Sequence, residues 1–259
     1  MVTCGIDVGS LSSEAVIFAD GDIAAYSIIR TGPESAQTAV TALEEALRNT
    51  DINKKDIEFT VATGYGRVIV PFADKNITEI ACHAKGAHYF FPSVRTILDM
   101  GGQDCKAIRC DEKGKMTSFL MNDKCTAGTG RSMEVMADLL QVRLEEIGPL
   151  SLKARGEPVK ISNTCVVFAK SEVLSLMRQG VNINDILAGL CDGIAERVKG
   201  LIRIVGVEED FVISGGISKN TGVVKRLEQK LGVMSHISFE PQIVGAVGAA
   251  LFARDLLQI

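Results

Sequence analysis

Three segments of the sequence place glycine and small or acidic residues directly after an apolar run. They are Asp7-Val8-Gly9-Ser10, Asp99 to Asp104, and Ser214-Gly215-Gly216. Phosphate groups bind where backbone N–H groups point at oxygen and side chains are too small to interfere. A carboxylate beside such a loop can hold Mg²⁺, often through water, because Mg²⁺ gives up its hydration shell reluctantly. The three loops therefore predict phosphate and magnesium chemistry.

Each loop taken alone is typical of an ordinary junction between a strand and a turn, but three of them favour nucleotide binding. Neither a Walker pattern nor a Gly-x-Gly-x-x-Gly loop occurs in these places, which argues against P-loop and Rossmann folds. The candidate catalytic residues are the carboxylates Asp7, Asp99 and Asp104. The candidate nucleotide-binding residues are Gly9, Ser10, Ser12, Ser13, Gly101, Gly102, Gln103, Gly215, Gly216 and Gln242.

Two of the seven cysteines, Cys125 and Cys165, stand in polar loops directly before predicted helices. A helix N-terminus lowers the pKa of a thiol and favours an anionic cluster nearby. An iron–sulfur cubane usually takes four thiolates, and a symmetric dimer would supply two from each chain. The spacing alone, which lacks a Cys-x-x-Cys pair, nevertheless favours two inert buried thiols.

The other five cysteines are predicted to be packing residues. Three of them fall in strand patterns, and Cys191 falls on the apolar face of a predicted helix. Cys82-His83 is an adjacent pair on a helix, and such a pair makes a poor metal site. Cysteines of a cytoplasmic protein stay reduced, so a disulfide framework is not expected.

Periodic patterns arrange these loops in two halves. Residues 2–28 and 95–121 share one order of strand, glycine loop, strand, turn and strand, which is a weak internal repeat. We expect residues 1–93 to form an N-terminal half and residues 94–259 a C-terminal half that carries both loop cysteines. A helix over 244–257, rich in small residues, is expected to pack back on the first half. The other helices are predicted at 36–47, 77–89, 129–140, 168–177, 183–205 and 222–231.

Bulk composition excludes several classes of function. The 259 residues suffice for two modest domains, and 46% apolar residues with a net charge of −4 are ordinary for a globular protein. No face is obviously basic, so nucleic acid is not expected as a partner. No apolar run reaches the roughly 18 residues of a membrane span, and a strand pattern begins at the N-terminus without a signal peptide. We therefore expect a cytoplasmic protein with no membrane or nucleic-acid partner.

These motifs together resemble the activator proteins of 2-hydroxyacyl-CoA dehydratases and the ATPase subunits of ATP-dependent benzoyl-CoA reductases. The resemblance runs from end to end of the chain, and its two cysteine loops are far more specific than its glycine loops. The matching stretches are Gly5–Ser10, Ala62–Arg67, Ala73–Lys75, Asp99–Asp104, Asn122–Cys125, Ala127–Arg131, Ser162–Cys165, Val167–Ala169, Ser214–Gly216 and Gly245–Leu251.

The resemblance implies an α/β fold of the actin, sugar-kinase and Hsp70 type, with two duplicated domains around a nucleotide cleft that holds ATP and Mg²⁺. It also implies a homodimer with one [4Fe–4S] cluster, bound by Cys125 and Cys165 of both protomers. Such proteins take an electron from ferredoxin or flavodoxin. ATP hydrolysis then drives its delivery to a partner iron–sulfur enzyme, a dehydratase or reductase.

One residue departs from the family pattern, in which a lysine commonly follows the first loop. This chain has Glu14 there, and a carboxylate near phosphates is unfavourable unless it faces a metal ion or solvent. Two other functions remain compatible with the glycine loops, namely a small-molecule kinase of the same fold and a non-enzymatic nucleotide sensor. Neither explains the paired cysteine loops.

Overall fold

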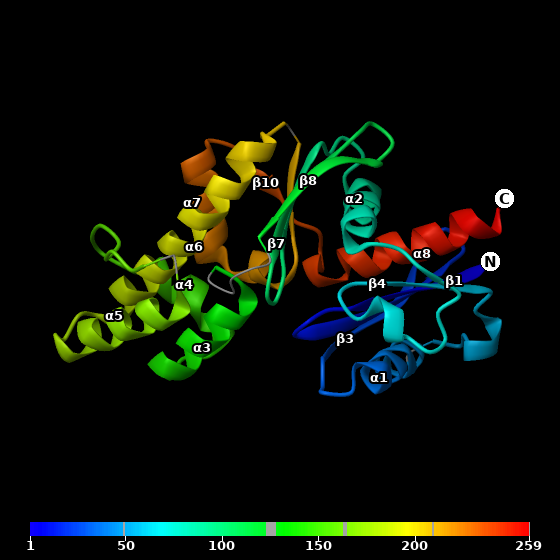
Figure 1. Cartoon of the computed structure of the whole chain (residues 1–259), viewed down its shortest axis with the longest axis horizontal. Coiled ribbons are helices and arrows are strands. Elements are labelled where there is room, and N and C mark those ends of the chain that lie inside the picture. The colour runs from blue at the N-terminus through cyan, green and yellow to red at the C-terminus, as the bar shows by residue number, and fades with distance from the viewer. Residues whose placement is uncertain (49, 123–127, 163–164, 209, 259) are drawn as a thin grey trace.

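The computed structural model describes residues 1–48, 50–122, 128–162, 165–208 and 210–258. Cys125, predicted to be a cluster ligand, therefore lies outside the described residues. The described chain forms two five-stranded mixed sheets with helices on both sides of each (Figure 1). The first has the order β3-β2-β1-β4-β5 and the second the order β10-β9-β6-β7-β8. The strands are β1 (Val2–Val8), β2 (Ser12–Ala19), β3 (Asp22–Arg30), β4 (Phe59–Thr63), β5 (Lys75–Asn76), β6 (Thr96–Met100), β7 (Cys105–Cys110), β8 (Met116–Asn122), β9 (Phe211–Ser214) and β10 (Ser235–His236).

The two sheets repeat one topology. β1 pairs antiparallel with β2 and parallel with β4, just as β6 pairs antiparallel with β7 and parallel with β9. A third antiparallel strand, β3 or β8, follows on one side, and a short parallel strand, β5 or β10, closes the other. The internal repeat seen in the sequence is thus a repeat of strand order.

Helices cover both faces of each sheet. They are α1 (Ser35–Leu47), α2 (Glu79–Phe90), α3 (Gly130–Leu140), α4 (Ile147–Ser151), α5 (Val166–Arg178), α6 (Ile183–Val205), α7 (Thr221–Leu231) and α8 (Val244–Leu257). The first sheet lies between α1 and α8, and the second lies between α2 and α6. We call β1–β5 with α1 the first lobe, β6–β10 with α3–α7 the second lobe, and α2 with α8 the central helices.

The predicted helices occur within one or two residues of the expected positions, whereas the five-residue helix α4 was not predicted. The last helix, α8, packs against β1 and β4. We retain the division at residues 93 and 94 as a proposal, because α2, which precedes it, packs on the second sheet. None of the helices in the described residues combines the length and apolar character that crossing a bilayer requires.

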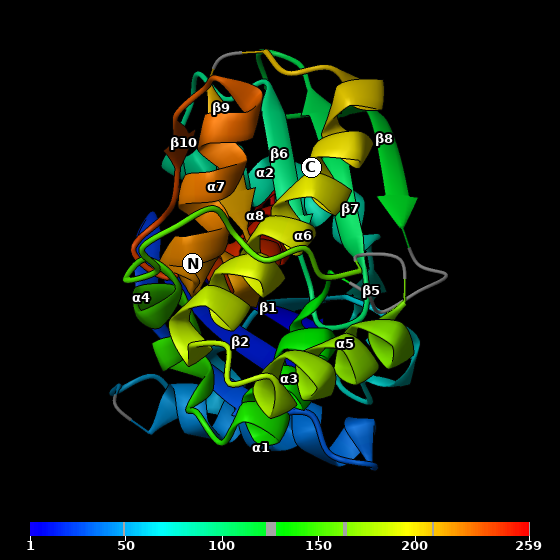
Figure 2. The same ribbon diagram turned by 90° about the vertical axis from the view of Figure 1, so that its left-hand side faces the viewer.

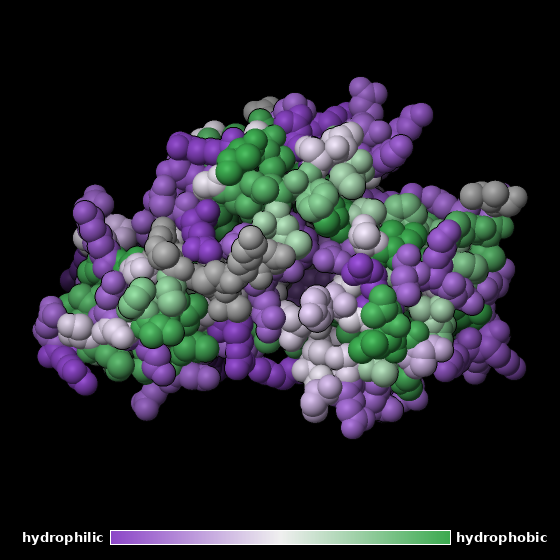
Figure 3. Space-filling model, viewed as in Figure 1, coloured by the Kyte–Doolittle hydropathy of each residue, from purple (hydrophilic) through white to green (hydrophobic). Residues whose placement is uncertain are grey.

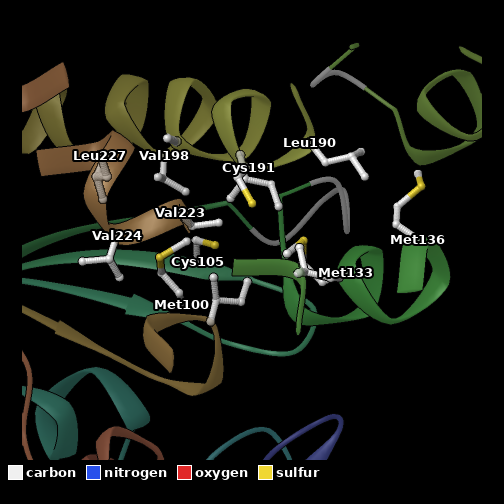
Figure 4. Packing of buried hydrophobic residues seen from close by; sticks show 14 of the residues in the cluster. Met100, Cys105, Met133, Met136, Leu190, Cys191, Val198, Val223, Val224 and Leu227 are labelled. Carbon is white, nitrogen blue, oxygen red and sulfur yellow. The ribbon is translucent and has the colours of Figure 1, made fainter. Parts of the chain in front are cut away.

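The largest apolar core lies in the second lobe, beneath α3, α6 and α7 (Figure 4). Met100 and Cys105 of the sheet meet Met133 of α3 and Cys191 of α6 in this core. Figure 2 shows α3 and α5 side by side below α6. The core therefore ties the strand that ends at the second glycine loop to the helices that follow the two cysteine loops.

The central helices touch backbone to backbone, because small residues face each other across their contact. A Cβ atom on Gly248 of α8 would overlap the Cys82 carbonyl of α2, and one on Gly86 would overlap the Val244 carbonyl. Glycine is required at these two positions because the helix backbones approach each other closely, and not because the positions need a positive φ angle. The contact fixes the distance between the two lobes.

We predict that Gly248→Ala destabilises the protein, because the new methyl group has no space and must push α2 away. The expected loss is about 1–3 kcal/mol of unfolding free energy, measured by urea denaturation. Gly200→Ala is the matched control, since Gly200 is an exposed residue of α6 with nothing within 4 Å of its added Cβ. That change should stabilise by about 0.5–1 kcal/mol. A Gly248→Ala protein as stable as the wild type would refute the close contact.

Candidate functional site

The three predicted glycine loops meet where the two lobes face each other. Asp7 lies near the end of β1, and Asp99 near the end of β6, directly opposite Ser214 of the parallel strand β9. Loops that follow the carboxyl ends of such strands commonly form ligand sites. Figure 3 shows the surface hollowed between the lobes, with hydrophilic residues around the hollow. We call this hollow the cleft.

The loops touch each other across the cleft. A Cβ atom on Gly102 would stand 2.7 Å from Leu11 Cγ and 2.8 Å from Ser10 Oγ. On the other side, Gln242 donates from Nε2 to Ser12 Oγ over 3.3 Å, and its side chain lies against Gly216. The structure thus brings together these residues of the first, second and third loops, with Gln242 as a bridge.

One predicted nucleotide contact, Ser13, lies apart from this group. The Ser13 hydroxyl is buried and shares a hydrogen bond of 2.8 Å with Thr31 Oγ1, on the face of β2 opposite to Ser12. Gln103 is exposed in the second loop. The Gly9 amide donates to the Ser12 carbonyl over 3.0 Å and closes the turn of the first loop.

One buried lysine joins two of the predicted catalytic carboxylates. Lys106 Nζ lies 2.6 Å from Asp104 Oδ1 and 3.4 Å from Asp99 Oδ2. Burial opposes the charged lysine, yet the two carboxylates raise the pKa of Lys106 above its usual value. Burial likewise opposes the charged form of Asp99, but nearby His83 and Lys106 hold its pKa below the usual value. Asp99 and Lys106 therefore form a charged pair.

Asp7 and Glu14, in contrast, are two neighbouring acidic residues rather than an acid and a base. They face each other across β1 and β2, and burial raises the pKa of Asp7 to about 6 against the lowering effect of His83. Burial and the neighbouring Asp7 raise the pKa of Glu14 well above its usual value. Both carboxyl groups disfavour ionisation, because they are buried away from water and because each would repel the charge of the other.

This donor set fits a magnesium ion that arrives with a nucleotide. Within the described part of the chain, no three histidine, cysteine, aspartate or glutamate side chains are arranged to hold a metal ion by themselves. Mg²⁺ commonly takes only one or two protein carboxylates and fills its other positions with phosphate oxygens and water. Asp7 from one lobe and Asp104 from the other could supply these carboxylates.

Two residues of the site were missed by the sequence analysis. Lys106 stands two residues after Asp104, so strand alternation places both on one face and could have revealed it. No pattern in the local sequence marks His83 as a site residue, because the adjacent residues Cys82 and His83 alone suggest only a poor metal site. Its ring lies 3.5 Å from Asp99 Oδ2 and 3.9 Å from Asp7 Oδ2.

Cys165 differs from the other cysteines that the structure describes. It is the N-cap residue of α5 and is half-buried, whereas the other five are buried. Burial raises the pKa of the Cys82 and Cys105 thiols to about 12 and of the Cys110 and Cys191 thiols to about 11. A half-exposed thiol at the start of a helix fits a cluster ligand, and the buried thiols fit packing.

The helix after the Cys125 loop is bonded to the second glycine loop. The backbone N–H of Gly130 donates to the Gly101 carbonyl over 3.0 Å, and that of Arg131 donates to the Gly102 carbonyl over 2.8 Å. These are two of the N–H groups that the first turn of a helix cannot satisfy internally. Leu11 of the first loop also lies against Gly130. The first turn of α3 thus contacts both loops.

Comparison with known proteins places this geometry in a family. Over its full length the chain is 48% identical to the activator of lactoyl-CoA dehydratase from Anaerotignum propionicum, covering 99% of that protein. It is 46% identical to the (R)-2-hydroxyglutaryl-CoA dehydratase activating ATPase of Acidaminococcus fermentans over 97% of this chain and 96% of that protein. Both similarities confirm the predicted resemblance.

Solved structures confirm the predicted fold. The activator of the 2-hydroxyisocaproyl-CoA dehydratase from Clostridium difficile with bound ADPNP is 40% identical and matches with a TM-score of 0.95, covering 100% of this chain and 96% of that one. A ROK family glucokinase from Streptomyces griseus matches at 14% identity and a TM-score of 0.59 over 98% of this chain and all of that one, and shares the fold alone. Residues 4–253 match the BadF/BadG/BcrA/BcrD ATPase family, and the chain belongs to that family.

Proposed function

We propose that this chain is an ATP-dependent electron-transfer activator. Two copies form a homodimer that holds one [4Fe–4S] cluster between them. ATP hydrolysis in the cleft drives delivery of a low-potential electron to a partner iron–sulfur enzyme, which is a 2-hydroxyacyl-CoA dehydratase or a related reductase. The names of the relatives support the type of partner, and the architecture of the site supports the coupling.

The observation that carries the proposal is the pair of backbone hydrogen bonds between α3 and the second glycine loop. Gly101 and Gly102 are proposed nucleotide contacts, and α3 begins five residues after Cys125. A shift of the loop on nucleotide binding or hydrolysis therefore moves the first turn of this helix. Sub-ångström shifts of a loop are amplified where they move a whole packed helix.

At the nucleotide end, each proposed residue has a distinct task. The N–H groups of the first and second loops bind phosphate oxygens, and Ser10 and Ser12 supply hydroxyl donors. Asp7 and Asp104 would hold Mg²⁺, which neutralises phosphate charge during transfer to water. Lys106 keeps Asp104 in place through its contact of 2.6 Å. Gly215 and Gly216 allow the nucleoside to lie against the backbone of the third loop.

At the cluster end, Cys125 and Cys165 would supply two thiolates from each protomer. The cluster would carry one electron at a time. Val167 and Phe168 in the first turn of α5 are 68% and 62% exposed, so two apolar side chains lie at the surface shortly after Cys165. Apolar residues at the centre of a protein interface are usual, and these two favour burial against a second copy.

The size of the energy requirement supports hydrolysis as its source. Lowering a one-electron potential by about 0.3 V costs roughly 7 kcal/mol, at 59 mV for each factor of ten. Allosteric coupling between binding sites is typically about 1–3 kcal/mol. Binding of a partner alone would therefore fall short. We further propose ferredoxin or flavodoxin as the electron donor, and the cytoplasm as the compartment in which the thiols stay reduced.

We predict that Cys125→Ser and Cys165→Ser abolish iron binding, because a cubane needs all four thiolates of the dimer. Anaerobically purified wild type should be brown and contain about four iron atoms per two chains. Iron content and molar mass by light scattering are the measurements. Removal of the iron should weaken the dimer, since metal–ligand bonds contribute to the interface.

Cys191→Ser serves as the control for the cysteine variants, because that thiol is buried against Asn220 and lies in the apolar core. It should keep the iron content of the wild type. Four iron atoms in a stable single chain, or full iron in Cys165→Ser, would show that no cluster bridges two copies. A colourless wild type would favour the kinase or the nucleotide sensor instead.

We predict that ATP hydrolysis depends on magnesium and falls at least about a hundredfold in Asp7→Asn and in Asp104→Asn. Each change removes a carboxylate charge that faces the metal and the phosphates. Phosphate release at saturating ATP is the measurement, and Asp138→Asn, an exposed position of α3, is the control. Wild-type rates in both variants would remove these carboxylates from the metal site.

A further inference from the structure

His83 is a buried histidine whose ring faces the ends of all three strands that carry the glycine loops. It is 5% exposed and projects from α2. Its Nδ1 lies 3.2 Å from Ser214 Oγ at the end of β9. Its Nε2 lies 3.5 Å from Asp99 Oδ2 at the end of β6 and 3.9 Å from Asp7 Oδ2 near the end of β1.

The polar groups around this ring form one connected set. The Ser214 hydroxyl donates to Asp99 Oδ1 over 3.3 Å, and the other oxygen of Asp99 lies 3.4 Å from Lys106 Nζ. Asp99 is therefore held from three sides, by a hydroxyl, an ammonium group and the imidazole. The same imidazole nitrogen that lies near Asp99 also lies near Asp7 in the other lobe. A single side chain thus contacts one proposed site carboxylate from each lobe.

The position of the ring is set by the packing of the central helices. A Cβ atom on Gly245, in the first turn of α8, would overlap Asp7 Oδ2 and stand 3.0 Å from His83 Nε2. Gly245 thus leaves room for the carboxylate and the imidazole to approach each other. Gly86 of α2 meets the Val244 carbonyl of α8 in the same way. The imidazole is therefore held by rigid elements rather than by a loop.

An ordinary buried histidine would satisfy its nitrogens with whichever polar groups lie nearby in the core. Here both ring nitrogens face side chains at the cleft, and a nonpolar side chain would leave Ser214 and the two carboxylates without this partner. Residues that orient metal ligands without touching the metal ion commonly change metal affinity by about ten- to a hundredfold when they are replaced.

We propose that His83 is a positioning residue that holds Asp7 and Asp99, one from each lobe, in the orientation that receives the metal–nucleotide complex. The inference rests on the proposed ATP–Mg²⁺ site in the cleft. The Nε2 side of the ring carries this role, because it faces both carboxylates, whereas the Nδ1 side faces a hydroxyl group. His83 also relates the two lobes, since its contacts hold only while Asp7 and Asp99 stay at a fixed separation.

Three substitutions separate the two sides of the ring. His83→Gln keeps a polar group near the position of Nε2, His83→Asn keeps one near Nδ1, and His83→Leu keeps neither. Binding of Mn²⁺ in the presence of ADP is followed by the electron paramagnetic resonance signal of the free ion, so the readout does not require turnover. ATP hydrolysis as a function of Mg²⁺ concentration and thermal unfolding are measured in parallel. His88→Gln, on the same helix with its Nε2 bound to the Glu112 carbonyl, is the control.

The proposal expects His83→Asn and His83→Leu to bind Mn²⁺ about tenfold more weakly and to need correspondingly more Mg²⁺ for hydrolysis. His83→Gln and His88→Gln should stay within about twofold of the wild type. Wild-type affinity in His83→Leu would overturn the role of His83. The role of His83 would also be overturned if all three His83 variants lost Mn²⁺ affinity equally and in proportion to the fall in their unfolding temperatures. That pattern would show that His83 acts only through packing. If the wild type took up no Mn²⁺ with ADP, the nucleotide site itself would be rejected, and the role of His83 with it.

Discussion

The structure depends on the close contact between α2 and α8. These helices stand between the two sheets, and glycines at the contact let their backbones meet without intervening side chains. Because α8 also packs on β1 and α2 on the second sheet, their contact fixes how the lobes face each other. The three glycine loops can border one cleft only at that separation. The chain thus uses small residues that are distant from the loops in sequence to define the site.

Charge gives the cleft its chemical character. Lys106 contacts Asp99 and Asp104, whereas burial raises the pKa values of Asp7 and Glu14 on the neighbouring strands. A divalent cation carried by a nucleotide would stabilise the charged forms of these carboxyl groups. Glu14 is the residue that departs from the family pattern. It lies opposite Asp7 on the neighbouring strand, so the proposed magnesium ion would supply positive charge where the family pattern has a lysine.

Much of the fold followed from the sequence, because strand alternation, helical spacing and glycine-rich strand ends are local signals. The roles of single residues were harder to predict. Ser12 and Ser13 were treated alike, although alternation along β2 sends only Ser12 toward Gln242. His83 reaches Asp7, Asp99 and Ser214 through contacts between segments distant in the chain, and no local pattern encodes them. The short helix α4 lacks the length that periodicity needs, and the predicted role of Cys125 remains a proposal.

The central claim is that the nucleotide in the cleft controls the cluster through α3. The most direct test is the rate at which an iron chelator removes iron from the anaerobic dimer, with Mg²⁺–ADP or with a nonhydrolysable Mg²⁺–ATP analogue bound. The account predicts rates that differ about fivefold or more, which corresponds to a difference of about 1 kcal/mol in the activation free energy of iron removal. Equal rates at saturation of both nucleotides would contradict it, because the first turn of α3 would then not transmit the state of the second glycine loop.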